Sequence, residues 1–224
     1  MSTNINKNAV KCIVFDLDGT LLDTLTTINH YVNVALDMNG IPPITYEECR
    51  SYVGYGARWL IECALKRHNV YSDSMHAKVF TDYNAVYNAD PYHLTEIYDG
   101  IESAIISLKE QGITLAVLSN KPDFATKEVV ARFFPNTFAM AGGAKDGLPL
   151  KPSPDTLLSM ISELGFNPEE CIYVGDSEVD VLTAKNANMP CVSVSWGFRT
   201  IAQLQEAGAF HIVNTADDML KIIL

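Results

Sequence analysis

Most of the side chains in this sequence that could do chemistry stand in four short segments. The first runs from Asp16 through Asp18 to Thr20, in the order Asp-Leu-Asp-Gly-Thr, directly after an apolar run. Residues two apart in an extended chain project to the same side, so the two carboxylates should lie together. Aspartates at the end of a strand are also common turn formers, so this segment alone leaves both interpretations open.

The other three segments supply a hydroxyl, an ammonium and two more carboxylates. Ser119 and Asn120 follow the run Ile-Thr-Leu-Ala-Val-Leu and offer a hydroxyl and backbone N–H groups to an anion. Lys151 precedes a helical pattern, and its ammonium is a point charge suited to phosphate. Asp176 follows the run Cys-Ile-Tyr-Val-Gly, and Asp180 comes four residues later on the helix expected to begin there.

Four carboxylates gathered at one site would repel one another strongly. Two unit charges about 4 Å apart interact by about 4 kcal/mol at an effective dielectric constant of about 20. The cluster therefore requires a hard divalent cation, and oxygen ligands of this kind favour Mg²⁺. The sequence thus predicts a magnesium site beside an anion site.

The elements that must position these side chains are strands and helices in alternation. Apolar runs of about 4–8 residues are typical of strands buried on both faces, and they end before Asp16, Ser119, Gly142, Gly175 and Gly197, with a sixth at 210–213. Helical spacing appears over 100–111 and 155–164. Alternation of this kind predicts an α/β fold with a doubly wound, Rossmann-like parallel-sheet core. In such a core, ligands bind at the carboxyl ends of the strands.

One long segment does not fit this alternation. It contains no convincing buried strand, but helical spacing recurs over 25–38, 46–53, 57–68 and 74–88. Thr45 and Glu48 are spaced to form a capping box at the start of the second helix. We therefore predict two domains, an α/β core formed by 1–23 plus 94–224 and an inserted helical domain formed by 24–93.

Charge and hydropathy exclude several classes of function. The chain has 16 basic and 27 acidic residues and a net charge of −11, so no broad surface should attract nucleic acid or an anionic membrane. No run approaches the roughly 18 apolar residues of a membrane span, and the first eleven residues lack the apolar stretch of a signal peptide. Five widely separated cysteines are typical of a reducing compartment. We therefore expect a cytoplasmic protein with no nucleic-acid or membrane partner.

Taken in order, the four segments resemble the motifs of the haloacid dehalogenase (HAD) superfamily of phosphohydrolases. Those motifs are Asp-x-Asp-x-Thr, a Ser or Thr, a Lys, and Gly-Asp-x-x-x-Asp, and the resemblance covers nearly the whole chain. It implies a Mg²⁺-dependent phosphatase that hydrolyses a small phosphorylated metabolite through an aspartyl-phosphate intermediate. It also implies that 24–93 is the cap domain that this family inserts after its first motif.

The resemblance assigns a role to each motif residue. Asp16 would be the nucleophile, and Asp18 would be the general acid that later activates water. Mg²⁺ would be held by Asp16, by Asp176 and by the backbone carbonyl of Asp18, while Asp180 would bond a metal-bound water or the phosphate-binding lysine. The phosphate ligands would be Thr20, Ser119, Asn120 and Lys151.

Residues outside the motifs are weaker candidates. The stretch from Gly54 to Arg58 resembles the specificity loop of the phosphoglycolate phosphatase subgroup. Arg58 could bind a substrate carboxylate through two hydrogen bonds, but a solvated arginine fits the pattern equally well. Lys121 and Arg199 are interpreted as surface charges, with Arg199 also a candidate to line the site because it follows a strand.

Several alternatives stay open at this point. A phosphoacceptor switch uses similar side chains, but such modules are about half this length and lack a helical insertion. A catalytically inactive relative is disfavoured because no motif residue is missing. Sugar phosphomutases with this cap usually have Val where this chain has Thr20, and His where it has Ile28, so we favour a phosphatase. Phosphoglycolate, sugar-phosphate, nucleotide and pyrophosphate substrates all stay possible, as do a monomer and a homodimer.

Overall fold

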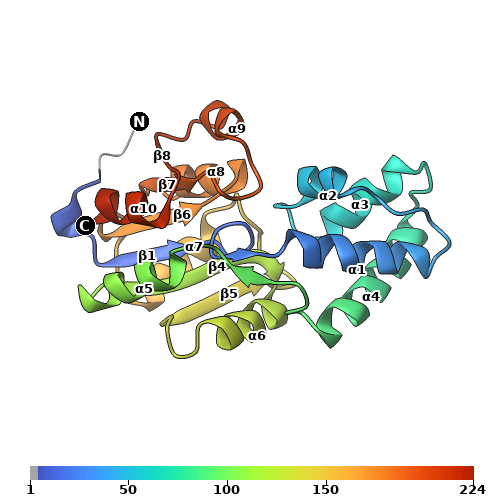
Figure 1. Ribbon diagram of the computed structural model, residues 1–224, viewed down its shortest axis with the longest axis horizontal. Helices are drawn as coiled ribbons and strands as arrows, with labels where there is room; N and C mark the ends of the chain where they lie inside the picture. Colours follow the sequence, from blue (N-terminus) through green and yellow to red (C-terminus); the bar gives the residue numbers. More distant parts are fainter. Residues whose placement is uncertain (1–4) are drawn as a thin grey trace.

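A six-stranded parallel sheet forms the centre of the larger part of the molecule (Figure 1). The computed structural model describes residues 5–224. The first four of the eleven residues that were examined for a signal peptide therefore lie outside the described residues. The strand order is β5-β4-β1-β6-β7-β8, and every neighbouring pair is parallel. The chain thus winds outward from β1 in both directions, which confirms the predicted doubly wound core. The strands are β1 (Cys12–Phe15), β4 (Thr114–Pro122), β5 (Met140–Ala144), β6 (Cys171–Gly175), β7 (Cys191–Val194) and β8 (His211–Val213).

The sheet is apolar on both faces because helices cover both. In β1, Ile13 and Phe15 pack into one hydrophobic cluster, while Cys12 and Val14 pack into another on the opposite face. Alternate residues of a strand point to opposite faces, so a continuous apolar run is what a doubly covered strand requires. The first cluster is completed by α5 (Ile101–Glu110), α6 (Asp123–Phe133) and α10 (Ala216–Ile223), and the second by α7 (Asp155–Glu163) and α8 (Glu178–Asn186).

Four helices form a separate body at one end of the sheet, far from the C-terminus (Figure 1). We call it the helical body; it consists of α1 (Leu25–Asp37), α2 (Tyr46–Tyr52), α3 (Ala57–Arg67) and α4 (Asp73–Ala89). These bounds lie close to the predicted ones, and α2 begins with the predicted capping box between Thr45 and Glu48. The helical body has its own hydrophobic cluster, which includes Leu36, Ile61 and Val79. Among the described residues, no helix is long and apolar enough to cross a membrane.

The two connections between the sheet and the helical body lie side by side. A short antiparallel pair joins β2 (Leu22–Asp23) to β3 (Glu96–Ile97) at this junction. The predicted domain boundaries stand next to this pair, and the division into two domains stays a prediction. The remaining short elements are α9 (Ile201–Glu206) and the 3₁₀ turns Lys7–Ala9 and Pro168–Glu170.

Two strands differ from the sequence prediction. The apolar runs end before Ser119 and Gly142, but β4 continues to Pro122 and β5 continues to Ala144. The extension brings the chain at Gly143 so close to β4 and α6 that a Cβ there would lie 2.5 Å from the Lys121 carbonyl oxygen. A glycine is needed at such a close approach. The extra pairing keeps the polar end of β4 in the sheet, where Ser119, Asn120 and Lys121 are buried.

Candidate active site

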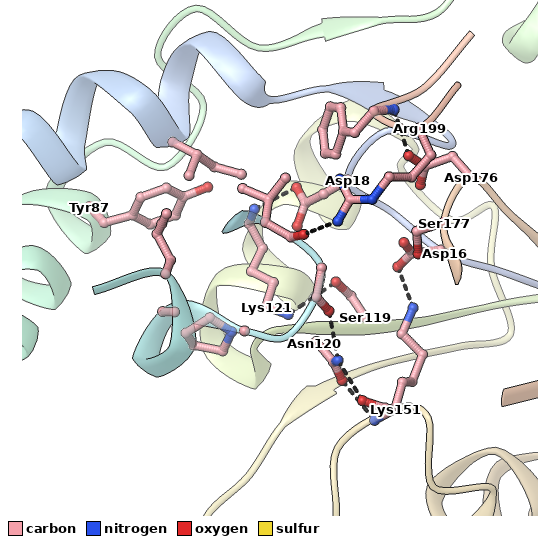
Figure 2. A pocket seen from close by; sticks show the side chains of 18 of the residues that line it. Asp16, Asp18, Tyr87, Ser119, Asn120, Lys121, Lys151, Asp176, Ser177 and Arg199 are labelled. Carbon is pink, nitrogen blue, oxygen red and sulfur yellow. Dashed lines mark hydrogen bonds and ion pairs between the residues drawn. The ribbon is translucent and has the colours of Figure 1, made fainter. Parts of the chain in front are cut away.

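The candidate site lies where β1, β4 and β6 end, at the edge of the sheet that faces the helical body (Figure 2). Asp16 follows β1, Ser119 and Asn120 stand at the end of β4, and Asp176 follows β6. The Asp16 N–H group donates to the Val174 carbonyl at 2.8 Å, so the end of β1 is fixed against β6. Neighbouring strands from distant parts of the chain therefore bring the motif residues together, at the edge where α/β proteins bind ligands.

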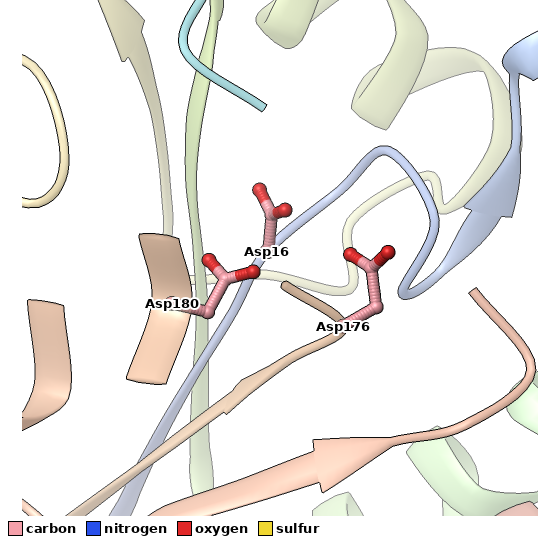
Figure 3. Close-up of side chains that lie close together, drawn as sticks. All are labelled: Asp16, Asp176 and Asp180. Carbon is pink, nitrogen blue, oxygen red and sulfur yellow. The ribbon is translucent and has the colours of Figure 1, made fainter. Parts of the chain in front are cut away.

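Three buried carboxylates form the centre of the site (Figure 3). Carboxylate oxygens of Asp16, Asp176 and Asp180 all lie within 4.8 Å of one another. Burial raises the pKa of Asp16 to about 7, although the neighbouring Lys151 ammonium opposes this. Burial, together with the charges of Asp180 and Asp16, also raises the pKa of Asp176 well above its ordinary value. Without a further cation, the cluster is therefore electrostatically strained.

Lys151 is the cation of this cluster. Its Nζ lies 2.8 Å from Asp16 Oδ1 and 2.7 Å from Asp180 Oδ1, and it donates to the Tyr173 hydroxyl at 3.0 Å. Burial alone would lower the pKa of Lys151, but the charges of Asp16 and Asp180 outweigh burial and the pKa stands well above its ordinary value. The side chain therefore stays an ammonium, well placed to hold an anion beside Asp16.

The residues present fit a divalent cation. One ammonium does not balance three carboxylates, and Asp16 Oδ1 has the ion pair with Lys151 but no hydrogen bond. The backbone also closes tightly around Asp176, since a Cβ on Gly19 would lie 2.5 Å from its Oδ2. Gly19 adopts a φ of +86°, a conformation that favours glycine. Hard oxygen donors in a buried acidic cluster are the ligands that Mg²⁺ prefers.

Asp176 and Asp180 are each oriented by hydrogen bonds. Asp176 Oδ2 accepts from the Phe198 N–H at 2.7 Å, and its Oδ1 accepts from the Thr20 hydroxyl at 3.2 Å. Thr20 is fully buried, and its hydroxyl donates to Asp176. The family resemblance had implied that this residue binds phosphate. Asp180 Oδ2 accepts from the Ser177 N–H and hydroxyl at the start of α8. These two bonds leave Asp180 Oδ1 facing Lys151. Lys151 is one of the two partners that the family resemblance implied for Asp180.

Asp18 has a different environment from Asp16. Its Oδ1 accepts from the Thr24 hydroxyl at 2.7 Å and from Lys121 Nζ at 2.6 Å. The interpretation of Lys121 as a surface charge is wrong, because its side chain is only 4% exposed. The extension of β4 explains the difference: the strand continues past Leu118 with an irregular register against β5, and Ser119, Asn120 and Lys121 all line the cavity. The end of the apolar run at Leu118 hid this continuation from the sequence.

The Asn120 side chain forms its hydrogen bonds with the backbone of two other segments, at Gly54 and Lys151. Its Nδ2 donates to the carbonyls of Gly54 and Lys151 at 2.9 and 3.0 Å, and its Oδ1 accepts from the Lys151 N–H at 2.9 Å. The side chain that the sequence assigned to phosphate therefore holds two backbone segments in place. Ser119, by contrast, lines the cavity, and its Oγ accepts from the Lys121 N–H.

Two arginines hold the helical body against the sheet. Arg199 donates to the Arg50 and Val53 carbonyls at 2.8 and 2.7 Å, and to Glu178 at 2.7 Å. Arg50 donates in return to the Phe198 carbonyl at 2.8 Å. Arg199 is buried, so its interpretation as a surface charge is wrong, whereas the alternative that it lines the site agrees with its place in the cavity wall. These partners lie far away in sequence, so no local pattern indicated them.

The predicted specificity loop lines the cavity through Gly54, Gly56 and Ala57 but not through Arg58. Gly54 lines the cavity, and its carbonyl accepts from Asn120. Arg58 does not line this cavity; its side chain is exposed, and its guanidinium lies over the Phe80 ring, 4.1 Å from the ring centroid. In this conformation, Arg58 is therefore not placed to bind a substrate carboxylate in the cavity.

The carboxylates line a small, partly open cavity between the sheet and the helical body. Its volume is about 60 Å³, far below the roughly 300–1,000 Å³ of pockets that bind drug-sized ligands. The side facing the sheet is polar, with Asp16, Ser119 and Lys151. The other side is largely apolar and comes mainly from the helical body, with Ile28, Val53, Leu60, Tyr83 and Tyr87. The cavity suits a ligand of few atoms with a charged group at the sheet end.

Without metal, the stability of the fold should depend on pH through Asp16. Its pKa is about 7 in the folded protein and about 3.9 in an unfolded chain. A raised pKa contributes stability below about pH 4, which is lost as the pH rises through about 7. In EDTA, Tm should therefore fall between pH 5.5 and pH 8, and this slope should be shallower in Asp16→Asn. A divalent cation should raise Tm more at pH 8 than at pH 5.5, and equal slopes in the two proteins would contradict the assignment.

The chain is similar to one family of proteins by sequence and to a solved structure by fold. The model of the haloacid dehalogenase-like hydrolase family matches residues 13–194 of the chain. Phosphoglycolate phosphatase 1 of Pseudomonas aeruginosa is 31% identical over 219 residues, with 94% of this chain and 78% of that protein covered. A phosphoglycolate phosphatase of Cereibacter sphaeroides is 35% identical over 218 residues, with 95% and 98% covered. The crystal structure of a candidate phosphoglycolate phosphatase from Lactobacillus delbrueckii subsp. bulgaricus superimposes with a TM-score of 0.90 at 32% identity, covering 96% of this chain and 98% of that one.

Proposed function

Because the chain belongs to the haloacid dehalogenase-like hydrolase family and is a phosphatase, we propose that it hydrolyses a small phosphate monoester through an aspartyl-phosphate on Asp16. Phosphoglycolate is the substrate we favour. The observation that carries the proposal is the contact between Asp16 and Lys151 at the floor of a small, partly open cavity. It combines a nucleophile and a phosphate-binding cation in a space that excludes large esters.

The substrate phosphoryl group is proposed to bind at the sheet end of the cavity. Lys151 and the Ser119 hydroxyl would hold its oxygens, with backbone N–H groups at the end of β4. The Lys151 ammonium also offsets the repulsion between the phosphate dianion and the Asp16 carboxylate. Charge neutralisation and positioning supply most of the rate enhancement in phosphoryl transfer, which needs little other help from the protein.

Asp16 and Asp18 are proposed to divide the chemistry. A carboxylate oxygen of Asp16 attacks phosphorus, the bond from phosphorus to the ester oxygen breaks, and that oxygen takes a proton from Asp18. A water molecule then gives a proton to Asp18 and attacks phosphorus, which releases inorganic phosphate and regenerates the Asp16 carboxylate. The hydrogen bonds from Thr24 and Lys121 hold the Asp18 side chain at the cavity wall.

The acidic cluster is proposed to hold Mg²⁺. Asp16, Asp176 and the backbone carbonyl of Asp18 would be its protein ligands, and Asp180 would act through Lys151. When bound, the ion supplies positive charge that neutralises the carboxylates and the phosphoryl oxygens. The hydrogen bonds from Thr20 and Phe198 then fix the direction in which Asp176 presents its oxygens.

The helical body is proposed to be a cap that selects the substrate. It closes the cavity with apolar side chains, so the volume left for the leaving group is small. Ile28 lies in this wall at the position where the related sugar phosphomutases usually have a histidine, so a proton-transferring group of that kind is missing there. The names of the relatives, all of which cover most of this chain, favour phosphoglycolate within the small esters. The five free cysteines agree with the cytoplasmic location that we propose from the sequence.

A panel of phosphate esters tests the proposed function. With Mg²⁺ present, kcat/KM from released phosphate should be highest for phosphoglycolate and much lower for glucose 6-phosphate, AMP and pyrophosphate. A cavity this small should reject the larger substrates unless the cap stays open. Preference for AMP or a sugar phosphate would overturn the proposed substrate while leaving a phosphatase. Full activity in EDTA would refute the proposed requirement for Mg²⁺.

Replacing Mg²⁺ with Ca²⁺ should inhibit the enzyme. Both ions accept carboxylate oxygens, but Ca²⁺ is larger and its coordination sphere is looser, so it should displace the Asp16 carboxylate from its attacking position. We expect Ca²⁺ to raise Tm at pH 8 but to reduce turnover by more than about tenfold, since displacements of about 1 Å can cost that much or more. Turnover with Ca²⁺ equal to that with Mg²⁺ would contradict this expectation.

A further inference from the structure

The wall of the cavity that belongs to the helical body is apolar except for a few polar atoms. Figure 2 shows Tyr87 on the side of the cavity away from Asp16, with its hydroxyl directed toward the cavity and Lys121 between the two. The Lys121 Nζ lies 5.0 Å from the centroid of the Tyr87 ring. An ammonium and a phenol thus share the end of the cavity opposite the nucleophile, where the leaving group of the substrate must lie.

Tyr87 carries a hydroxyl with no hydrogen-bond partner. The residue is 2% exposed, and its Oη is buried without a bond to any described residue. A buried polar group without a partner destabilises a fold, so such groups in native proteins need an explanation. Burial raises the pKa of Tyr87 well above its ordinary value, and the group therefore stays a hydrogen-bond donor. A ligand acceptor in the cavity would satisfy it.

Lys121 is the cation with donors left for a ligand. Three cationic side chains line the cavity among the described residues. Of the other two, Lys151 is proposed to hold the phosphoryl group, and Arg199 holds the helical body against the sheet. Lys151 contacts Asp16, Asp180 and a tyrosine hydroxyl, and Arg199 is bound by Glu178 and by two carbonyls of the helical body. An ammonium has three N–H groups, and within residues 5–224 the Lys121 ammonium donates one hydrogen bond, to Asp18.

We propose that Lys121 and Tyr87 form the subsite that binds an anionic carboxylate at the non-phosphate end of the substrate. This inference rests on the proposed hydrolysis of a small ester and names the residues that select it. One ammonium and one hydroxyl match the two oxygens of a carboxylate, and much of the rest of this wall is apolar, with Ile28, Val53 and Leu60. Arg58, the candidate from the sequence, lies outside this cavity.

A matched pair of esters tests the subsite. Phosphoglycolate and ethyl phosphate are nearly the same size, but only phosphoglycolate has a carboxylate. The measured quantity is the ratio of kcat/KM for phosphoglycolate to kcat/KM for ethyl phosphate, in the wild type and in Lys121→Met, Tyr87→Phe and Arg58→Ala. Lys127→Met is the control for the loss of a lysine, because Lys127 is exposed on α6 and makes its ion pair with Asp123. Tm of every variant is measured first, with Mg²⁺ present.

The ratio should fall by about 10-fold to 100-fold in Lys121→Met and by about 3-fold to 10-fold in Tyr87→Phe, mainly through KM for phosphoglycolate, as expected for lost hydrogen bonds to a charged group. It should change by less than about twofold in Lys127→Met and Arg58→Ala. Tyr87→Phe keeps the test decisive if Lys121→Met fails to fold, because it removes only one buried oxygen without a partner.

Other outcomes would overturn the inference. A ratio that falls in Arg58→Ala but not in Tyr87→Phe would assign the carboxylate to the predicted specificity loop. Equal losses on both esters in Lys121→Met, with no change of ratio in Tyr87→Phe, would leave Lys121 as a positioning residue for Asp18 alone. A wild type that hydrolyses both esters equally well would refute the subsite and leave the phosphatase intact. Hydrolysis of neither ester would refute the proposed substrate class itself.

Discussion

Replacing Asp16 with asparagine should reduce turnover by at least about three orders of magnitude, or about 4 kcal/mol of activation free energy. Asparagine has nearly the same shape but no negative charge, so it cannot form the bond to phosphorus. The two neighbouring carboxylates are not placed to replace Asp16 as the nucleophile. Asp176 and Asp180 are held by hydrogen bonds from Phe198 and Ser177, and Asp180 also faces Lys151. The loss should therefore be the same for every ester.

The same variant should not be less stable than the wild type in EDTA. Asp16 is buried, and burial raises its pKa to about 7, so its charge is a cost to the metal-free fold at pH 8. Asp37→Asn is the matched control, since Asp37 is exposed at the end of α1. Acid quenching during turnover should trap phosphate on the wild type and on the control but not on Asp16→Asn. Near-normal turnover in Asp16→Asn would refute the nucleophile.

The acidic cluster could be predicted from the sequence because its members follow the ends of buried strands. Asp16 follows β1 and Asp176 follows β6, and these strands are neighbours in the sheet. Parallel strands end at a common edge, so apolar runs followed by carboxylates are enough to place the charges together. The helical spacing of 24–93 likewise predicted four helices, because their apolar faces repeat at the helical period.

The contacts between the sheet and the helical body could not be predicted in this way. Arg199 binds the carbonyls of Arg50 and Val53, which are 149 and 146 residues away in the chain. Backbone carbonyls carry no sequence signal, so an arginine that binds them looks like any solvated arginine. Thr20 is a similar case: the motif suggested phosphate, but its hydroxyl goes to Asp176, 156 residues away.

The two residues of the proposed carboxylate subsite show the same limit. The periodicity of α4 predicts that Tyr87 is buried, but not that its hydroxyl lies at a cavity without a partner. Lys121 lines the cavity because β4 continues through the polar residues that follow the apolar run. This continuation depends on β5, which pairs with β4 as far as Ala144 with a register shift between Leu118 and Pro122. Tertiary pairing therefore decided what local hydropathy could not.

Replacing Asp18 with asparagine should separate the acid role from the nucleophile. The asparagine Oδ1 can still accept from Thr24 and Lys121, so the variant should fold, and the backbone carbonyl proposed as a metal ligand is kept. A general acid contributes about 10²-fold to 10⁴-fold when the leaving group needs a proton. The first step should therefore slow by about that factor with ethyl phosphate, whose alkoxide is a poor leaving group.

An aryl phosphate makes this prediction specific, because its phenolate leaves without a proton. With 4-nitrophenyl phosphate, the burst of nitrophenolate in rapid-mixing experiments should slow far less in Asp18→Asn than the first step does with ethyl phosphate. Dephosphorylation should then limit turnover, because Asp18 is also the proposed base for water, and phosphoenzyme should accumulate. Asp16→Asn should show no burst with either ester. Equal slowing of the first step on alkyl and aryl esters in Asp18→Asn would contradict the acid role and would indicate instead that Asp18 acts through its ion pair with Lys121.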